Sequence, residues 1–198
     1  MKVMCMNPKK TMILKTVLKF LSQNEIDKPL TISNIAQELD IGKSTIYEYF
    51  NSKEEMLLSA MNLLNQMILD SLIKPEDLTL SFEKALKKHL DRLYEHAKKH
   101  EMLQEYVNHP DIGKLPREAK KHMMETMHET VHALTKFLRD ILDIGVSEGI
   151  IKAVGPMRRA VVESLIFGGM FLSTDPFRHI EADALIAETY QAVLTLHR

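Results

Sequence analysis

The stretch that decides the fold is TISNIAQELDIGKSTIYEYFNSKEEM, residues 31 to 56. It predicts two short helices joined by a tight turn, the arrangement of a helix-turn-helix. Ala36 supplies the small residue needed where the helices approach. Asp40 stands at the turn, which requires a residue that tolerates a left-handed backbone. Ile46 and Phe50 then pack the second helix onto the first, so these four residues are the expected core of the motif.

Helix-start signals flank this motif on both sides. Thr31 can cap the first short helix with its hydroxyl. Ser52 and Glu55 have the spacing of a capping box for the longer helix that follows. The motif is therefore expected to begin and end at these residues.

Composition and periodicity extend the helical prediction to the whole chain. Of 198 residues, 45% are hydrophobic and only 7 are Gly and 7 Pro, which favours long helices. Apolar residues recur at helical spacing almost throughout. We expect an all-α fold of about nine helices and a loop at HPDIGKLP, residues 109–116. The expected helices cover approximately residues 13–21, 31–39, 43–50, 56–68, 82–97, 102–107, 116–147, 156–173 and 181–197.

Bulk properties exclude several classes of protein. The N-terminal MKVMCMNPKK has no apolar core of a secretory signal, and no apolar run approaches the ~20 residues of a membrane span. The single cysteine, Cys5, suits a reducing cytoplasm. The net charge is −1, so any nucleic-acid binding must be local. We expect a cytoplasmic protein.

The residues that follow the turn resemble those of a known family. T-x-Y-x-Y-F at residues 45–50, followed by x-S-K-E-E-x-L at 51–57, resembles the TetR family of bacterial transcriptional regulators. The resemblance covers about residues 9–60. It implies a DNA-binding domain at 1–52 and a larger helical domain at 53–198, which binds an effector and dimerises through helices at about 156–173 and 181–197.

The resemblance also assigns DNA contacts residue by residue. Lys43, Ser44 and Thr45 match positions that face the groove floor, while Tyr47 and Tyr49 match positions that hold phosphates or base edges. Hydroxyls, ammonium groups and helix N-termini are ordinary phosphate donors. The DNA-contacting residues implied in this way are Thr31, Lys43, Ser44, Thr45, Tyr47, Tyr49 and Lys53.

Three residues depart from the family pattern. Gly42 replaces a common serine or threonine cap, and Ser44 replaces a frequent glycine. Glu48 puts a carboxylate on or near the reading helix, where it either points away or accepts from a cytosine amino group. These departures leave the predicted fold unchanged but do not reveal the operator sequence.

The segment AVVESLIFGGMFL, residues 160–172, is apolar almost all round. A helix of this kind must be buried, either in the body of the protein or against a partner subunit. We favour a two-fold dimer that presents two recognition helices to a palindromic operator. The expected interface residues are Val161, Leu165, Gly168, Gly169 and Leu172.

An effector pocket is less clearly marked. A Met-rich lining would suit an adaptable apolar pocket, although such stripes also occur in a plain core. The candidate lining residues are Met102, Glu105, Tyr106, Met123, Met127 and Phe167. His89, His96 and His100 lie among lysines, which favours a solvated face.

The pentapeptide HETVH, residues 128–132, matches the zinc-peptidase signature H-E-x-x-H formally. Its residues His128, Glu129 and His132 fall on a polar flank of the helix, and the third ligand of the extended motif is missing downstream. We therefore expect no enzyme, no metal and no cofactor other than a small-molecule effector. The alternatives are a metal-binding sensor or zinc hydrolase at HETVH, and a helical interaction module without DNA binding.

The prediction is a cytoplasmic, homodimeric regulator that binds a double-stranded operator. A small-molecule effector would release it from that operator, as in a TetR-type repressor.

Overall fold

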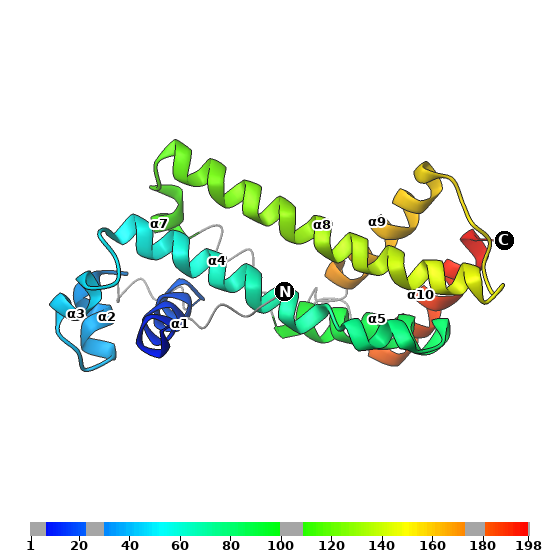
Figure 1. Cartoon of the computed structure of the whole chain (residues 1–198), viewed down its shortest axis with the longest axis horizontal. Coiled ribbons are helices and arrows are strands. Elements are labelled where there is room, and N and C mark those ends of the chain that lie inside the picture. The colour runs from blue at the N-terminus through cyan, green and yellow to red at the C-terminus, as the bar shows by residue number, and fades with distance from the viewer. Residues whose placement is uncertain (1–6, 23–29, 100–108, 173–180, 198) are drawn as a thin grey trace. The chain divides into compact units, whose positions relative to one another are not determined.

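The computed structural model describes residues 7–22, 30–99, 109–172 and 181–197 (Figure 1). Within these ranges the chain is helical and contains no strand, so the all-α prediction is confirmed. The nine α-helices there are α1 (Pro8–Ser22), α2 (Ile32–Glu38), α3 (Lys43–Tyr47), α4 (Lys53–Leu72), α5 (Phe82–Lys99), α7 (Pro110–Gly113), α8 (Arg117–Ser147), α9 (Pro156–Leu172) and α10 (Ala182–Leu196). A short 3₁₀ helix, η1 (Pro75–Thr79), follows α4.

The segment at 109–116, predicted to be a loop, contains the short helix α7. Its local sequence starts a helix, because Pro110 occupies the first turn and Asp111 is the acidic residue of that turn. The Nδ1 atom of His109 accepts the Asp111 N–H at 3.2 Å and caps the helix. The loop prediction was wrong because it used Pro and Gly content without this start signal. The helix predicted over 102–107 lies outside the described residues.

The chain forms two compact units. The head unit contains Met1–Met67 and Met102–His128, and the body unit contains Ile68–Glu101 and Glu129–Arg198. α4 and α8 each contribute residues to both units.

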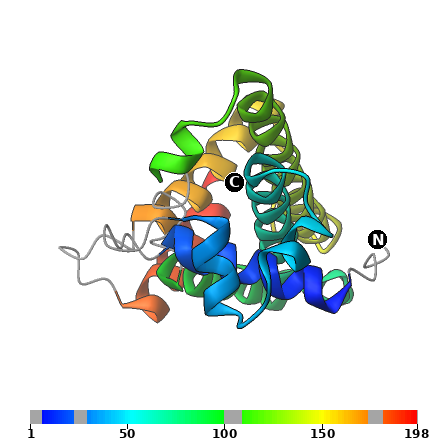
Figure 2. The same cartoon turned by 90° about the vertical axis from the view of Figure 1, so that its left-hand side faces the viewer.

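In the head unit, α1 packs against α2, and α2 packs against α3. Figure 2 faces these three blue helices. The inward face of α1 buries Ile13, Leu14, Val17 and Leu21 almost completely. Asn7 starts α1, since its Oδ1 accepts the Lys9 N–H at 2.9 Å. Apolar residues at helical spacing thus pack α1 against the helix-turn-helix.

In the body unit, α5, α9 and α10 pack against one another. The rings of Phe82 and Tyr190 lie 5.9 Å apart between centroids. The Glu148 carboxylate accepts the Phe82 N–H at 3.1 Å and so caps the start of α5. Gly145 lies so close to Phe82 that a Cβ atom there would be 2.7 Å from the ring, which explains the glycine. α8 ends at Ser147, and Gly149 follows with φ +70°, the left-handed backbone that commonly ends a helix.

The body unit also buries ionisable groups. Asp77 pairs with Arg92, and Glu163 pairs with Arg139 through two hydrogen bonds of 2.5 and 3.0 Å. Paired burial is the condition under which charges are tolerated in a core. These pairs were not predicted from sequence.

The prediction of a solvated histidine face on α5 is wrong for His89. Its side chain is fully buried and its ring lies edge-on to Phe137, with centroids 5.3 Å apart. Burial, with the nearby Arg92 charge, lowers the pKa of His89 to about 4. His89 follows Phe82 by seven residues, the spacing of a core position, and this periodicity outweighs its lysine neighbours. His96 is half-buried, and His100 lies outside the described residues.

One described stretch, Lys53–Thr79, has a window of mean hydropathy 1.3, which matches a membrane span by length and composition only. Of that window, 44% is buried. Core helices of soluble proteins have the same composition, and Met56, Leu57, Ala60 and Leu64 are core residues here. The stretch is therefore weak evidence for a membrane.

Candidate nucleic-acid interface

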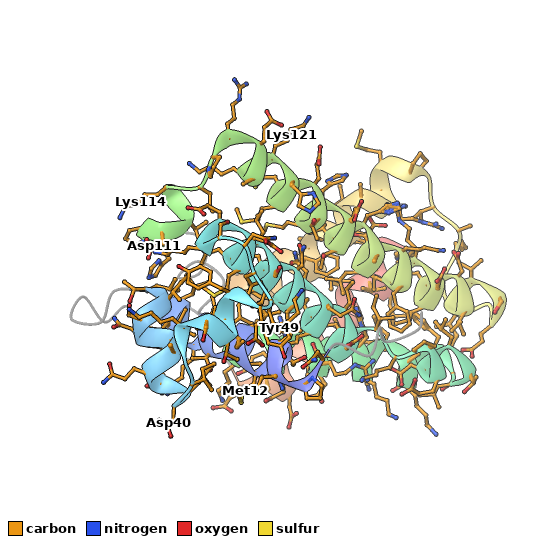
Figure 3. All side chains as sticks on the ribbon, turned by 60° about the vertical axis from the view of Figure 1, so that its left-hand side comes forward. Met12, Asp40, Tyr49, Asp111, Lys114 and Lys121 are labelled. Atoms are coloured by element: carbon orange, nitrogen blue, oxygen red, sulfur yellow. The ribbon has the colours of Figure 1, made fainter. Side chains whose placement is uncertain are left out.

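The turn between α2 and α3 closes by backbone geometry. The N–H of Ile41 donates to the Ala36 carbonyl at 3.0 Å, and the N–H of Asp40 donates to the Gln37 carbonyl at 3.2 Å. This pair of bonds is a Schellman motif, which requires a left-handed residue at its centre. Asp40 is that residue, with φ 51°, the one positive φ among described non-glycine residues. Its carboxylate points away from the helices at the tip of the turn (Figure 3).

α3 is held by one face and exposed on the other. Ile46 and Phe50 are buried, with exposed fractions of 0% and 1%, and Ala36 is 4% exposed at the approach of α2. In the first turn of α3, Lys43 and Ser44 are exposed, and Ser44 lies roughly opposite Ile46. The buried residues therefore fix the orientation of α3, and its start is presented to solvent, as a recognition helix requires.

The remaining predicted contacts surround this helix. Tyr47 is 54% exposed, which is unusual for a large aromatic side chain and leaves its hydroxyl open to a partner. Thr45 and Tyr49 are half-buried. Thr31 caps α2, because its Oγ1 accepts the Asn34 N–H at 3.1 Å. Its hydroxyl hydrogen stays available as a donor.

The three departures from the family pattern are all on the exposed side. Gly42 is the N-cap of α3 and provides no side-chain hydrogen bond. A Cβ at Gly42 would lie 3.2 Å from the Ser44 hydroxyl, so a larger cap would crowd that side chain. Glu48 is exposed and directly follows α3.

The start of α4 is capped in a modified way. Ser52 accepts the Glu55 N–H at 3.1 Å, as the capping box predicts. A capping box predicts that the Glu55 carboxylate accepts the Ser52 N–H. Here it accepts the N–H and the side-chain amide of Asn51 instead, each at 2.8 Å. These hydrogen bonds lower the pKa of Glu55. The cap holds Lys53 at the first position of α4.

Lys53 is paired within the head unit. Its Nζ lies 2.9 Å from Oδ1 of Asp111 on α7. Asp111 also lies near His109 and Lys114, at 3.8 and 3.9 Å. Figure 3 shows Asp111 on α7 and Lys114 directly after it. Sequence reasoning missed Asp111, although its Pro-Asp helix start was a signal that this segment is ordered.

Lys10 is a second cation close to the helix-turn-helix. Its Nζ lies 5.1 Å from the centroid of the Phe50 ring, a cation–π contact. Lys9 next to it is exposed. The start of α1 therefore adds positive charge beside Phe50, a buried core residue of the helix-turn-helix.

The candidate effector residues are only partly described. Met102, Glu105 and Tyr106 lie outside the described residues. Met123 is buried and Met127 is 39% exposed, both in the head unit, whereas Phe167 is half-buried in the body unit. The pocket stays a prediction.

A shallow groove of about 590 Å³ lies along the surface of α1. It is lined by Pro8, Thr11, Met12, Lys15, Thr16 and Lys19. One helix contributes all of these residues, so the groove does not enclose a ligand.

The α9 helix has an apolar face that is exposed in the described part of the chain. Val162 and Ile166 are buried, while Met157, Val161 and Leu165 are 79%, 47% and 52% exposed. Gly168 is exposed and Gly169 half-buried; the side chain of Leu172 is not described. Apolar residues four apart form a continuous stripe on a helix, so this face is a candidate contact surface.

The HETVH residues lie on the outside of α8. His128, Glu129 and His132 are exposed, as the polar flank of the helix predicts. Among the residues that the structure describes, no group of three or more His, Cys, Asp or Glu side chains is placed to hold a metal ion.

One family model matches the region of the helix-turn-helix. Residues 28–60 match the model for "Bacterial regulatory proteins, tetR family". The chain is 30% identical over 173 residues to the uncharacterized HTH-type transcriptional regulator YerO of Bacillus subtilis (strain 168), covering 83% of this chain and 58% of YerO. It thus spans a little over half the length of that relative.

Solved structures share the fold. The TetR family transcriptional regulator PfmR of Thermus thermophilus is 19% identical, with TM-score 0.58 and coverage of 92% of this chain and 97% of PfmR. The regulator FadR of Bacillus subtilis, solved with stearoyl-CoA, is 18% identical, with TM-score 0.62 and coverage of 94% and 97%.

Proposed function

The chain belongs to the TetR family of bacterial transcriptional regulators, and from this membership we propose that it is a cytoplasmic repressor released from a palindromic operator by a small-molecule effector. The observation that carries the proposal is the helix-turn-helix. α3 is fixed by buried Ile46 and Phe50 and exposes Lys43, Ser44 and Tyr47. This arrangement supports insertion of α3 into a major groove.

DNA binding can be tested with the region flanking the protein's own gene. We expect specific binding that weakens with salt, since lysine–phosphate contacts release counterions. Lys43→Ala should weaken binding about tenfold or more, and Tyr47→Phe should weaken it less. Lys84→Ala, which removes an exposed lysine from α5 in the body unit, is the matched control. Equal binding by Lys43→Ala and wild type would refute this DNA interface.

The exposed face of α9 supports a homodimer. Met157, Val161 and Leu165 leave an apolar stripe open to water, and a second copy would cover it with the same stripe. Leu165→Glu should dissociate the dimer and reduce operator affinity, as sedimentation and DNA binding would show. Leu165→Met, which keeps the stripe apolar, should remain dimeric. A monomeric wild type at micromolar concentration would contradict this part of the proposal.

For the effector we propose a molecule with a long apolar chain, with a long-chain acyl-CoA as the first candidate. FadR of Bacillus subtilis was solved with stearoyl-CoA, and the methionines of this chain suit a flexible apolar ligand. Stearoyl-CoA should release the protein from its operator while free coenzyme A does not. Unchanged operator affinity at saturating stearoyl-CoA would exclude this ligand class.

A further inference from the structure

The Lys53 ammonium, to which the family resemblance assigns a DNA contact, already has a partner. Its Nζ is 2.9 Å from Asp111 Oδ1, and both residues belong to the head unit. The side chain of Asp111 is 15% exposed and that of Lys53 is 30% exposed. Because water screens this pair only partly, its attraction exceeds that of a typical surface ion pair. A phosphate must compete with the carboxylate for the same ammonium.

The other neighbours of Asp111 cannot replace Lys53 fully. Lys114 lies 3.9 Å away and its side chain is 77% exposed, so solvent screens it. His109 lies 3.8 Å away, but its Nδ1 accepts the Asp111 N–H and therefore carries no proton. Burial also lowers the pKa of His109, which favours the neutral ring. Lys53 is therefore the principal cation of this carboxylate among the described residues.

We propose that Asp111 sets the affinity of the protein for DNA by competing with operator phosphate for Lys53. The inference rests on the proposed function, because it requires Lys53 to contact DNA. α7 is joined by Lys114, Leu115 and Pro116 to α8, which contributes residues to both units.

The test compares Asp111→Asn with wild type in operator binding over a range of salt concentrations. Asparagine keeps the shape of the side chain and removes its charge. Asp111→Asn should bind about fivefold more tightly per half-site. Its plot of log affinity against log salt should be steeper by about 0.9 per protomer, the value for one added phosphate contact. A merely structural role would not steepen this plot.

Matched variants separate the pair from general charge effects. Glu118→Gln removes the same charge from an exposed site of the head unit and should leave affinity and slope unchanged. In a Lys53→Gln background, Asp111→Asn should change neither the DNA affinity nor the salt slope. If Asp111→Asn does not fold, Asp111→Ser replaces it, because serine can still hydrogen-bond in the first turn of α7. The same gain in affinity and in salt slope is expected.

Two results would overturn the proposal. One is unchanged or weaker binding by Asp111→Asn and Asp111→Ser with an unchanged slope. The other is that Asp111→Asn raises DNA affinity as much in the Lys53→Gln background as in the wild-type background. If Lys43→Ala still weakens binding in either case, only this inference fails and the proposed function stands. If neither wild type nor any variant binds DNA, both fail.

Discussion

The helix-turn-helix and the body unit hold their polar groups in different ways. Around α2 and α3, the polar groups that matter are near neighbours in sequence: Thr31 caps α2 locally, and Asp40 closes the turn with its own backbone. In the body, Asp77 pairs with Arg92, and Arg139 pairs with Glu163, across separate helices. The difference teaches that a short motif defines its local geometry by itself, whereas a helical body depends on contacts between segments distant in sequence.

The largest expected effects come from the aromatic anchor of each unit. Phe50→Ala and Phe82→Ala should each lower the free energy of unfolding by about 3–5 kcal/mol, since both rings are fully buried. Hydrogen exchange would show where the loss acts. We expect faster exchange in α1–α3 for Phe50→Ala and in α5, α9 and α10 for Phe82→Ala. Uniformly faster exchange in both variants would show that the two units unfold as one.

His89 should make the body sensitive to acid. Its pKa is about 4 in the folded chain and about 6.5 when unfolded. The unfolded chain therefore binds more protons, and stability is full above pH 6.5 and is lost as pH falls toward 4. Between pH 7 and pH 5 the loss should be about 2 kcal/mol.

Urea unfolding at these two pH values measures the loss. His89→Leu should remove this part of the pH dependence, because leucine fills the site without titrating. His128→Leu, at an exposed site on α8, is the matched control and should unfold like wild type at both pH values. An unchanged pH dependence in His89→Leu would show that His89 is not the group responsible.

A smaller effect is expected at the turn of the head. Asp40→Ala should cost about 1 kcal/mol, because alanine is disfavoured at a φ of 51°. Asp40→Gly should be neutral or slightly stabilising, since glycine adopts this backbone without strain. Thermal unfolding of the two variants measures the difference. Equal stability of the Ala and Gly variants would show that the left-handed backbone imposes no cost here.

The comparison also explains which features the sequence could predict. Ala36, Asp40, Ile46 and Phe50 have roles that depend on neighbours a few residues away, so their spacing carries the information. The Lys53–Asp111 pair joins α4 to α7, and no local pattern specifies such a contact. His89 was misread because its neighbours Lys87 and Lys88 suggested solvent, although its place in the helical period indicates the core.

The most direct test of the central claim is the affinity of purified Lys43→Ala for the operator relative to wild type. The region flanking the gene serves as the operator, and binding is measured at two salt concentrations with unrelated DNA as competitor. The account predicts specific wild-type binding, weakened about tenfold by Lys43→Ala, with a shallower salt dependence. Equal affinity and equal salt dependence of the two proteins would contradict the placement of α3 on DNA.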